Sequence, residues 1–252
     1  MVLAVVDTET TGLEETDQIV ELAIVMIDPE RAARTEWSAW SSLIRPSCPV
    51  SLGARATHHI LDAELAEAPS VTELLPARGL PEFGRPAESE VEDNEVDPER
   101  VVFVAHNAAF DRRMLVQSGF HPEILPPRTI CTWRVALHLY PEAPGHSNQV
   151  LRYFLGVEPP PCDLPPHRAL PDALVTASIL ERMLKERSVS DLIKLTSEPA
   201  VLHRVTFGQH RGKLWSELDS GMLHWVLKRN FDDDTKHTAR HHLEQRSGEE
   251  RK

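Results

Sequence analysis

Apolar stretches separated by polar turns occupy the first half of the chain and predict a sheet. Residues 2–9, 18–28 and 36–46 are rich in β-branched and apolar side chains over strand-like lengths. Their short connections favour antiparallel pairing, since parallel neighbours need long crossovers. Residues 101–107 (VVFVAHN) predict a fourth strand, and residues 128–140 predict a short strand that passes into a helix.

Helical spacing of apolar residues predicts the elements that cover this sheet. The segments are 51–60, 62–75 with Asp62 as its N-cap, 108–119, 146–156 and 168–187. A run of strands followed by alternating strands and helices is typical of an α/β or α+β sheet covered by helices.

Two stretches interrupt this pattern and suggest the domain organisation. Residues 76–100 lack periodicity and are dominated by proline, glycine and acids, which predicts a solvated, flexible insertion or an acidic docking segment. After a boundary near 190–200, residues 201–246 resume as a small basic and aromatic unit. We expect a main domain over residues 1–190 and this separate C-terminal unit.

The first predicted strand ends in two acids, Asp7 and Glu9. Alternate residues of a strand project from one face, so the two carboxylates share a face if the strand reaches Glu9. Like charges held close repel each other, and a divalent cation with a preference for oxygen ligands removes that conflict. The alternative is a strand that ends in a polar turn, with both acids solvated.

Further acids and a histidine follow at the ends of other predicted elements. Asn107 can cap the helix after the fourth strand, which places Asp111 in its first turn, at the carboxyl end of a strand. Pro171 is tolerated in a first helical turn, so the last long helix should begin near Arg168 or Ala169. His167 then lies on the preceding loop, with Asp172 inside the helix. Taken singly, each of these residues could also be merely solvated.

Composition narrows the class of protein. Three scattered cysteines in 252 residues form no CxxC pair, which argues against disulfides and structural zinc and favours the cytoplasm. No signal peptide and no membrane span are evident. The net charge of −12 argues against a nucleic-acid partner, because phosphate binding usually uses a basic surface. The total includes the acids that would bind metal ions, so the net charge is only weak evidence against such a partner.

Three motifs in this order carry a resemblance: DTETTGL (7–13), AHNAAFD (105–111) and HRALPD (167–172). The chain resembles the DEDDh branch of the DnaQ-like 3′→5′ exonucleases, and its tail is similar to a small C-terminal unit found in that branch. The resemblance implies a ribonuclease H-like α/β fold, with a mixed five-stranded sheet of three antiparallel strands followed by parallel strands, flanked by helices. The acidic stretch 76–100 departs from the family pattern, as does Pro171 before Asp172.

The resemblance also implies roles for particular residues. Asp7, Glu9, Asp111 and Asp172 would hold two Mg²⁺ ions, for which Mn²⁺ could substitute, and His167 would be the general base that takes a proton from the attacking water. These five residues form the predicted catalytic set. A histidine suits that role because it titrates near neutral pH.

Substrate contacts follow from the same resemblance. The backbone around Thr8 and Thr10 would meet the 3′-hydroxyl, and Leu13 would wedge against the terminal base, although core packing is the alternative for this leucine. His106 and Asn107 are expected to line the phosphate path, although Asn107 could be only a cap.

The tail combines basic and aromatic side chains that suit either a nucleic-acid strand or a small helical cap. They are Arg211, Lys213, Lys228, Arg229, Trp215 and Trp225. The histidine-rich run 237–242 (HTARHH) is interpreted as a solvated helix end rather than a metal site.

The resulting hypothesis is a metal-dependent 3′→5′ exodeoxyribonuclease that releases nucleoside 5′-monophosphates from DNA 3′ ends, single-stranded or duplex, in repair or recombination. The alternatives are an exoribonuclease that trims RNA 3′ ends, a proofreading subunit with a DNA polymerase as partner, and a binding module without activity. The presence of all five chemical residues argues against the last.

Overall fold

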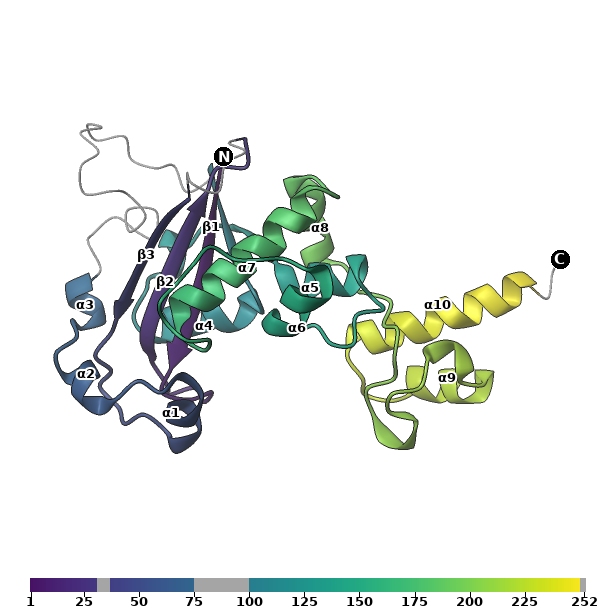
Figure 1. Ribbon diagram of the computed structural model, residues 1–252. Coiled ribbons are helices and arrows are strands. Elements are labelled where there is room, and N and C mark those ends of the chain that lie inside the picture. Colours follow the sequence, from purple (N-terminus) through teal and green to yellow (C-terminus); the bar gives the residue numbers. More distant parts are fainter. Residues whose placement is uncertain (31–36, 75–99, 250–252) are drawn as a thin grey trace.

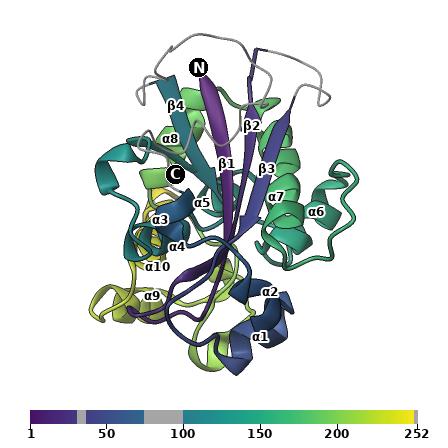
Figure 2. The same ribbon diagram turned by 90° about the vertical axis from the view of Figure 1, so that its left-hand side faces the viewer.

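The computed structural model describes residues 1–30, 37–74 and 100–249, and its strands form one mixed sheet. The strands are β1 (Val2–Thr10), β2 (Ile19–Ile27), β3 (Ser38–Leu43), β4 (Val101–Ala105) and β5 (Arg128–Cys131). Figure 2 shows β4, β1, β2 and β3 side by side, within the order β3-β2-β1-β4-β5. The β1/β2 and β2/β3 pairs are antiparallel, whereas β1/β4 and β4/β5 are parallel. The predicted sheet is therefore confirmed.

Helices cover the sheet on both faces. They are α1 (Leu52–His58), α2 (Asp62–Ala66), α3 (Val71–Leu74), α4 (Ala108–Gln117), α5 (Thr132–Leu139), α6 (Asn148–Leu155), α7 (Ala169–Leu184) and α8 (Val189–Ser197), with a 3₁₀ turn at Pro122–Ile124. Among the residues described, no helix is both long and apolar enough to cross a membrane. The expected insertion 76–100 lies outside the described residues, apart from Arg100.

The predicted helix 62–75 is corrected in two respects. It forms two short helices, α2 and α3, because the chain turns at Pro69 between them. The N-cap of α2 is Leu61, and Asp62 is already helical. The Asp62 carboxylate instead accepts two hydrogen bonds from Arg55, at 2.7 and 2.8 Å.

Side-chain alternation along β1 divides the core into two layers. Leu3 and Val5 pack in the cluster that includes α5, α6, α7 and α8, whereas Ala4 and Val6 pack in the cluster that includes α4. All four side chains are fully buried. Because β1 extends to Thr10, the same alternation directs its later odd-numbered residues to the α7 face and Thr8 to the α4 face.

The C-terminal segment has a hydrophobic cluster of its own. Its helices are α9 (Ser220–Leu227) and α10 (Asp233–Glu249), with 3₁₀ turns at Gly208–His210 and Trp215–Glu217, at the opposite end of the molecule from β3 (Figure 1). Val205, Trp215, Leu218, Leu223, Val226 and Ala239 form the buried centre. Trp215 is therefore a core residue, so for this side chain the alternative of a small helical cap holds and contact with a nucleic acid does not. The run 237–242 lies within α10 rather than at a helix end.

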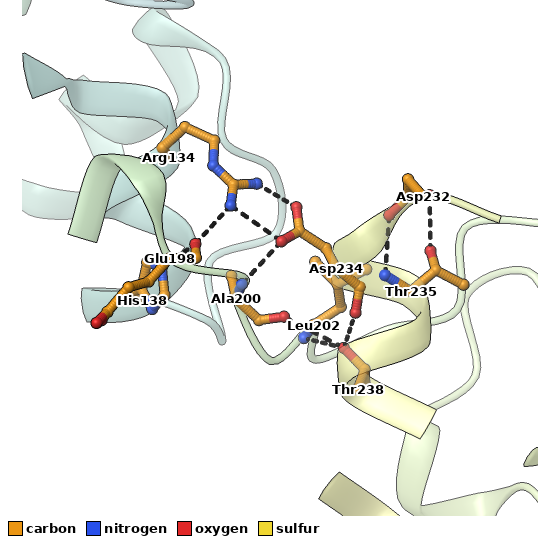
Figure 3. Close-up of polar contacts among 9 residues, drawn as sticks. All are labelled: Arg134, His138, Glu198, Ala200, Leu202, Asp232, Asp234, Thr235 and Thr238. Carbon is orange, nitrogen blue, oxygen red and sulfur yellow. Dashed lines mark hydrogen bonds and ion pairs between the residues drawn. The ribbon is translucent and has the colours of Figure 1, made fainter. Parts of the chain in front are cut away.

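A polar junction joins this segment to the rest of the molecule (Figure 3). Arg134 on α5 forms a two-pronged ion pair with Asp234 on α10 and also donates to the Glu198 carbonyl at 2.6 Å. The Asp234 carboxylate accepts a further bond from the Ala200 amide at 2.8 Å, and both charged side chains are largely buried. Thr238 accepts from the Leu202 amide, so the linker is bonded to α10 at two points. These contacts hold α10 in one position against α5.

Candidate active site

Three carboxylates meet where β1 ends against α7. Asp7 and Glu9 come from β1, and Asp172 comes from the first turn of α7. One ligand oxygen from each lies within 4.8 Å of the others, the one such group of three found in the described part of the chain. The alternation of β1 explains the geometry, because the odd-numbered residues face α7. The expectation that Asp7 and Glu9 share a face is met.

Asp111 reaches the site from the other side of the sheet. It lies in the first turn of α4 and is only 3% exposed. The Thr8 hydroxyl, which faces α4, donates a hydrogen bond of 2.8 Å to its Oδ1. Asp111 is not in the group of three, although its charge acts on Asp7. The structure thus brings three of the four predicted acids together and places the fourth beside them.

The electrostatics of the cluster are unfavourable to ionisation. Burial, with the charges of Asp111 and Asp172, raises the pKa of Asp7 well above its usual value. Burial and the charge of Asp172 raise the pKa of Glu9 to about 8, and burial raises that of Asp111 to about 7. Burial also raises the pKa of Asp172, against the opposing effect of His167. A bound divalent cation would relieve this repulsion, so the donor set fits a metal that prefers oxygen ligands.

His167 lies on the loop immediately before α7, as expected. Arg168 is the N-cap, α7 begins at Ala169, and Pro171 lies in the first turn. The backbone of His167 has a φ of 62°, a left-handed conformation that is uncommon for a residue with a side chain. Its Nδ1 is 3.9 Å from Asp172 Oδ2, and its side chain is 59% exposed. The imidazole therefore stands at the open edge of the acid cluster.

Three of the five residues expected to bind substrate, Thr8, Thr10 and Leu13, line a cavity of about 510 Å³ beside the acids. Its walls include Thr8, Glu9, Thr10, Leu13 and Phe110. The side chain of Leu13 is 70% exposed, so the alternative of core packing is wrong. The Thr10 hydroxyl is used within the turn, where it donates to the Gly12 carbonyl at 2.7 Å.

His106 differs from expectation, whereas the role of Asn107 stays a prediction. One ring nitrogen of His106 contacts the Thr132 hydroxyl at 2.9 Å, and the other contacts the His146 carbonyl at 2.8 Å. With both nitrogens engaged, the ring supports the β4–α4 turn and has no nitrogen left for a phosphate; burial lowers its pKa to about 4. Asn107 occupies the N-cap position of α4 with a φ of 82°, but its side chain makes no cap hydrogen bond.

Three residues near the acids were missed by the sequence analysis. Glu21 on β2 is paired in register with Glu9 and is bound by Arg168. Gln149 on α6 donates to Asp172 Oδ1 at 3.1 Å. Glu21 did carry a signal, since it is a lone acid inside the apolar run IVELAIVMI. Gln149 carried none, because its contact depends on how α6 packs against α7.

Comparison with known proteins gives a family match. A family model described as "Exonuclease" (RNase T) matches residues 4–180. Exodeoxyribonuclease 10 of Escherichia coli (strain K12) is 32% identical over 96% of this chain and 99% of its own length. A DNA polymerase III subunit epsilon-like protein of Rhodobacter capsulatus is 29% identical over 87% of this chain, but the match covers only 28% of that protein.

Solved structures agree with this match. Exonuclease X in complex with 5′-overhanging duplex DNA superposes with a TM-score of 0.57 and 29% identity, over 77% of this chain and 99% of that one. The nuclease domain of 3′hExo, a DEDDh family member bound to rAMP, has a TM-score of 0.53 over 73% of this chain. At 16% identity, the second match shows the fold alone.

Proposed function

The chain belongs to the exonuclease family and is a 3′–5′ exonuclease of the DEDDh type, and from this premise we propose that it degrades DNA from 3′ ends. The proposed products are nucleoside 5′-monophosphates, and the proposed setting is DNA repair or recombination in the cytoplasm. DNA is favoured over RNA because the relative that matches nearly end to end is named an exodeoxyribonuclease. The three cysteines are unpaired, which is compatible with a reducing compartment.

The observation that carries the proposal is the convergence of Asp7, Glu9 and Asp172, with Asp111 beside them. Members of this family generally use divalent metals. We assign these four carboxylates to two Mg²⁺ ions, with Mn²⁺ as a substitute. When bound, the cations would neutralise charge on the phosphate as the new bond to phosphorus forms and the old one breaks.

The remaining chemistry is assigned to residues of this chain. His167 takes a proton from the attacking water, and the water oxygen bonds to phosphorus. The bond from phosphorus to the 3′-oxygen breaks, and that oxygen takes a proton from solvent. Its exposed ring on the loop before α7 supports this role, since substrate and water can both reach it. The cavity by Thr8, Thr10 and Leu13 would receive the terminal nucleotide, with the Leu13 side chain against its base.

The loop that carries Leu13 is suited to this contact because α4 anchors it. Arg113 donates to the Leu13 carbonyl at 3.3 Å, and Gln117 donates to the Glu14 and Asp17 carbonyls at 3.1 and 2.9 Å. The backbone is therefore fixed while the leucine side chain remains exposed. An apolar side chain held in this way can contact any base, which suits an exonuclease without sequence preference.

A labelled-end assay tests the function directly. The protein is incubated with single-stranded DNA, duplex DNA or RNA, each labelled at the 5′ end, with Mg²⁺ or EDTA. We expect stepwise shortening of DNA from the 3′ end with Mg²⁺ and no cleavage with EDTA. Faster shortening of RNA than of DNA would favour the exoribonuclease, and stable co-purification with a polymerase would favour the proofreading subunit.

For the C-terminal unit, residues 201–246, we propose a nucleic-acid contact outside the active site. Trp225 is 42% exposed, and the Arg229 guanidinium lies 5.4 Å from its ring centre. Arg211 and Lys213 are exposed on the loop that precedes α9. Cations and an exposed aromatic ring together suit a strand with stacked bases and phosphates.

Charge removal tests this contact. The double variant R211Q/K213Q is expected to raise KM for DNA and to lessen its dependence on salt concentration, with kcat unchanged, because fewer phosphate contacts release fewer counterions. Lys194→Gln on α8, which also removes an exposed cation, is the matched control. A KM and salt dependence equal to those of the control would refute the contact.

A further inference from the structure

Glu21 is the most deeply buried acid near the cluster, and the proposed chemistry gives it no task. It lies on β2 directly across from Glu9 and is 2% exposed. Its charge adds to the repulsion on both Asp7 and Glu9. It is not in the group of carboxylates that could share a cation. A buried carboxylate in this position needs other partners to balance it.

Those partners all come from the start of α7. The guanidinium of Arg168 donates from Nε to Glu21 Oε2 at 2.9 Å and from Nη2 to Oε1 at 2.8 Å. The backbone amide of Ala169 donates to Oε2 at 2.9 Å. Arg168 is itself 15% exposed at the side chain, so the pair is shielded from water. This two-pronged geometry is the strong form of an arginine–carboxylate contact.

The contacts replace an ordinary helix cap. The N-cap of α7 is Arg168, whose side chain bonds none of the free amides of the first turn. Glu21 supplies the acceptor for the Ala169 amide from a neighbouring strand, and its negative charge also suits the positive end of the helix. The start of α7 is thereby fixed to β2 at one residue.

The two functional groups on α7 flank this fixed point. His167 precedes Arg168 directly and has the strained φ of 62°, which persists only where the surroundings enforce it. Asp172 lies one turn further on, and its amide donates to the Arg168 carbonyl at 3.3 Å. Movement of Arg168 would therefore displace the adjacent imidazole first, whereas Asp172 has an anchor of its own in the bond from Gln149.

We propose that Glu21 and Arg168 form a positioning pair that sets the place of His167 over the acid cluster. The inference rests on the proposed function, because it concerns how His167 is held for the proposed reaction. It assigns no contact with substrate to either residue. Arginine is required over lysine, because only the planar guanidinium can bond both carboxylate oxygens in parallel. The pair acts as one unit, so replacing either residue should lower kcat as much as replacing both.

The test uses the full-length variants Arg168→Lys, Arg168→Gln, Glu21→Gln and the double variant E21Q/R168Q. We expect kcat to fall about 10- to 100-fold in each, on the scale of a misplaced catalytic group. KM for DNA should stay within threefold, and Mn²⁺ affinity by calorimetric titration should be nearly unchanged. Arg45→Gln, which breaks an exposed arginine–glutamate pair elsewhere, is the control and should retain full kcat.

The outcomes separate the inference from the function on which it rests. If the wild type shortens no DNA, the proposed function fails, whatever the variants do. If the wild type is active and folded Arg168→Lys or Arg168→Gln retains its kcat, the positioning pair is overturned and the exonuclease stands. If the fold decrease in kcat of the double variant equals the product of the decreases in the two single variants, the two residues do not act as a unit. The double variant also leaves no unpaired buried charge, which guards against a result caused by unfolding.

Discussion

Replacing Glu9 by glutamine removes one of the like charges that the fold holds together. In the absence of metal, Glu9→Gln should therefore stabilise the protein, although the same residue is assigned to metal binding. The side chain keeps nearly the same size and shape, so packing should change little. The substitution thus separates the electrostatic strain of the site from its geometry.

The magnitude follows from the pKa of Glu9, which burial and the charge of Asp172 raise from 4.5 to about 8. Each pKa unit corresponds to about 1.4 kcal/mol, so ionising this group costs the fold at most about 4 kcal/mol at pH 8. Because the folded-state pKa is the higher one, the folded protein binds more protons than the unfolded chain. Below pH 4.5, Glu9 therefore takes nothing from the free energy of unfolding of the wild type. As the pH rises from 4.5 towards 8, that free energy declines.

The assay is urea unfolding of the metal-free protein in EDTA, from pH 5 to pH 8. Glu9→Gln should exceed the wild type at pH 8 by up to about 4 kcal/mol, and the difference should shrink towards zero at pH 5. Added Mg²⁺ should stabilise the wild type more than the variant, because it relieves repulsion that the variant lacks.

Glu67→Gln is the matched control, because Glu67 is an exposed glutamate outside the site. It should follow the wild type at every pH. A metal-free Glu9→Gln protein that is less stable than the wild type at pH 8 would refute the reasoning. A stability difference that does not vary with pH would do the same, since it would point to packing rather than to charge.

Three further outcomes are expected. Asp7→Ala or Asp172→Ala should reduce the rate of nucleotide release at least about 1,000-fold, on the scale of electrostatic stabilisation in active sites, with an unchanged circular-dichroism spectrum; near wild-type rates in either would end the metal assignment. His167→Gln should lower kcat about 100- to 10,000-fold, as expected for loss of a general base, while Mn²⁺ binding by calorimetry stays intact; a loss of that binding would identify the histidine as a ligand. Arg134→Met leaves the Asp234 carboxylate without its charged partner in a junction largely shielded from water, and should lower the free energy of unfolding, measured in urea, by about 3–5 kcal/mol. A decrease below about 1 kcal/mol would show that water reaches the pair.

The sequence predicted what depends on local periodicity. The antiparallel pairing of the first three strands follows from their short connections, and the shared face of Asp7 and Glu9 follows from strand alternation. The loop position of His167 follows from the tolerance of a first helical turn for Pro171. Site roles drawn from these positions stay predictions. The C-terminal domain boundary likewise stays a prediction, although the segment has its own hydrophobic cluster.

What the sequence did not predict depends on contacts between distant elements. Glu21 was interpreted as part of an apolar strand, and only the packing of α7 reveals its partner Arg168. His106 was assigned to the phosphate path because the positions of Thr132 and His146 were unknown. Trp215 was grouped with exposed aromatics by composition, although it is 1% exposed. Composition gives the chemistry of a side chain and leaves its surroundings open.

The junction of Arg134 and Asp234 has a consequence for how this tail can be exchanged between related nucleases. The two residues lie 100 positions apart, and each is satisfied chiefly by the other and by the linker backbone between the two parts. A grafted tail without an acid at position 234 would leave the Arg134 guanidinium on α5 without a carboxylate partner. The first residue of α5, Thr132, contacts His106. Chimeras of related nucleases should therefore fold stably only when both sides of the junction, Arg134 and Asp234, are transferred together.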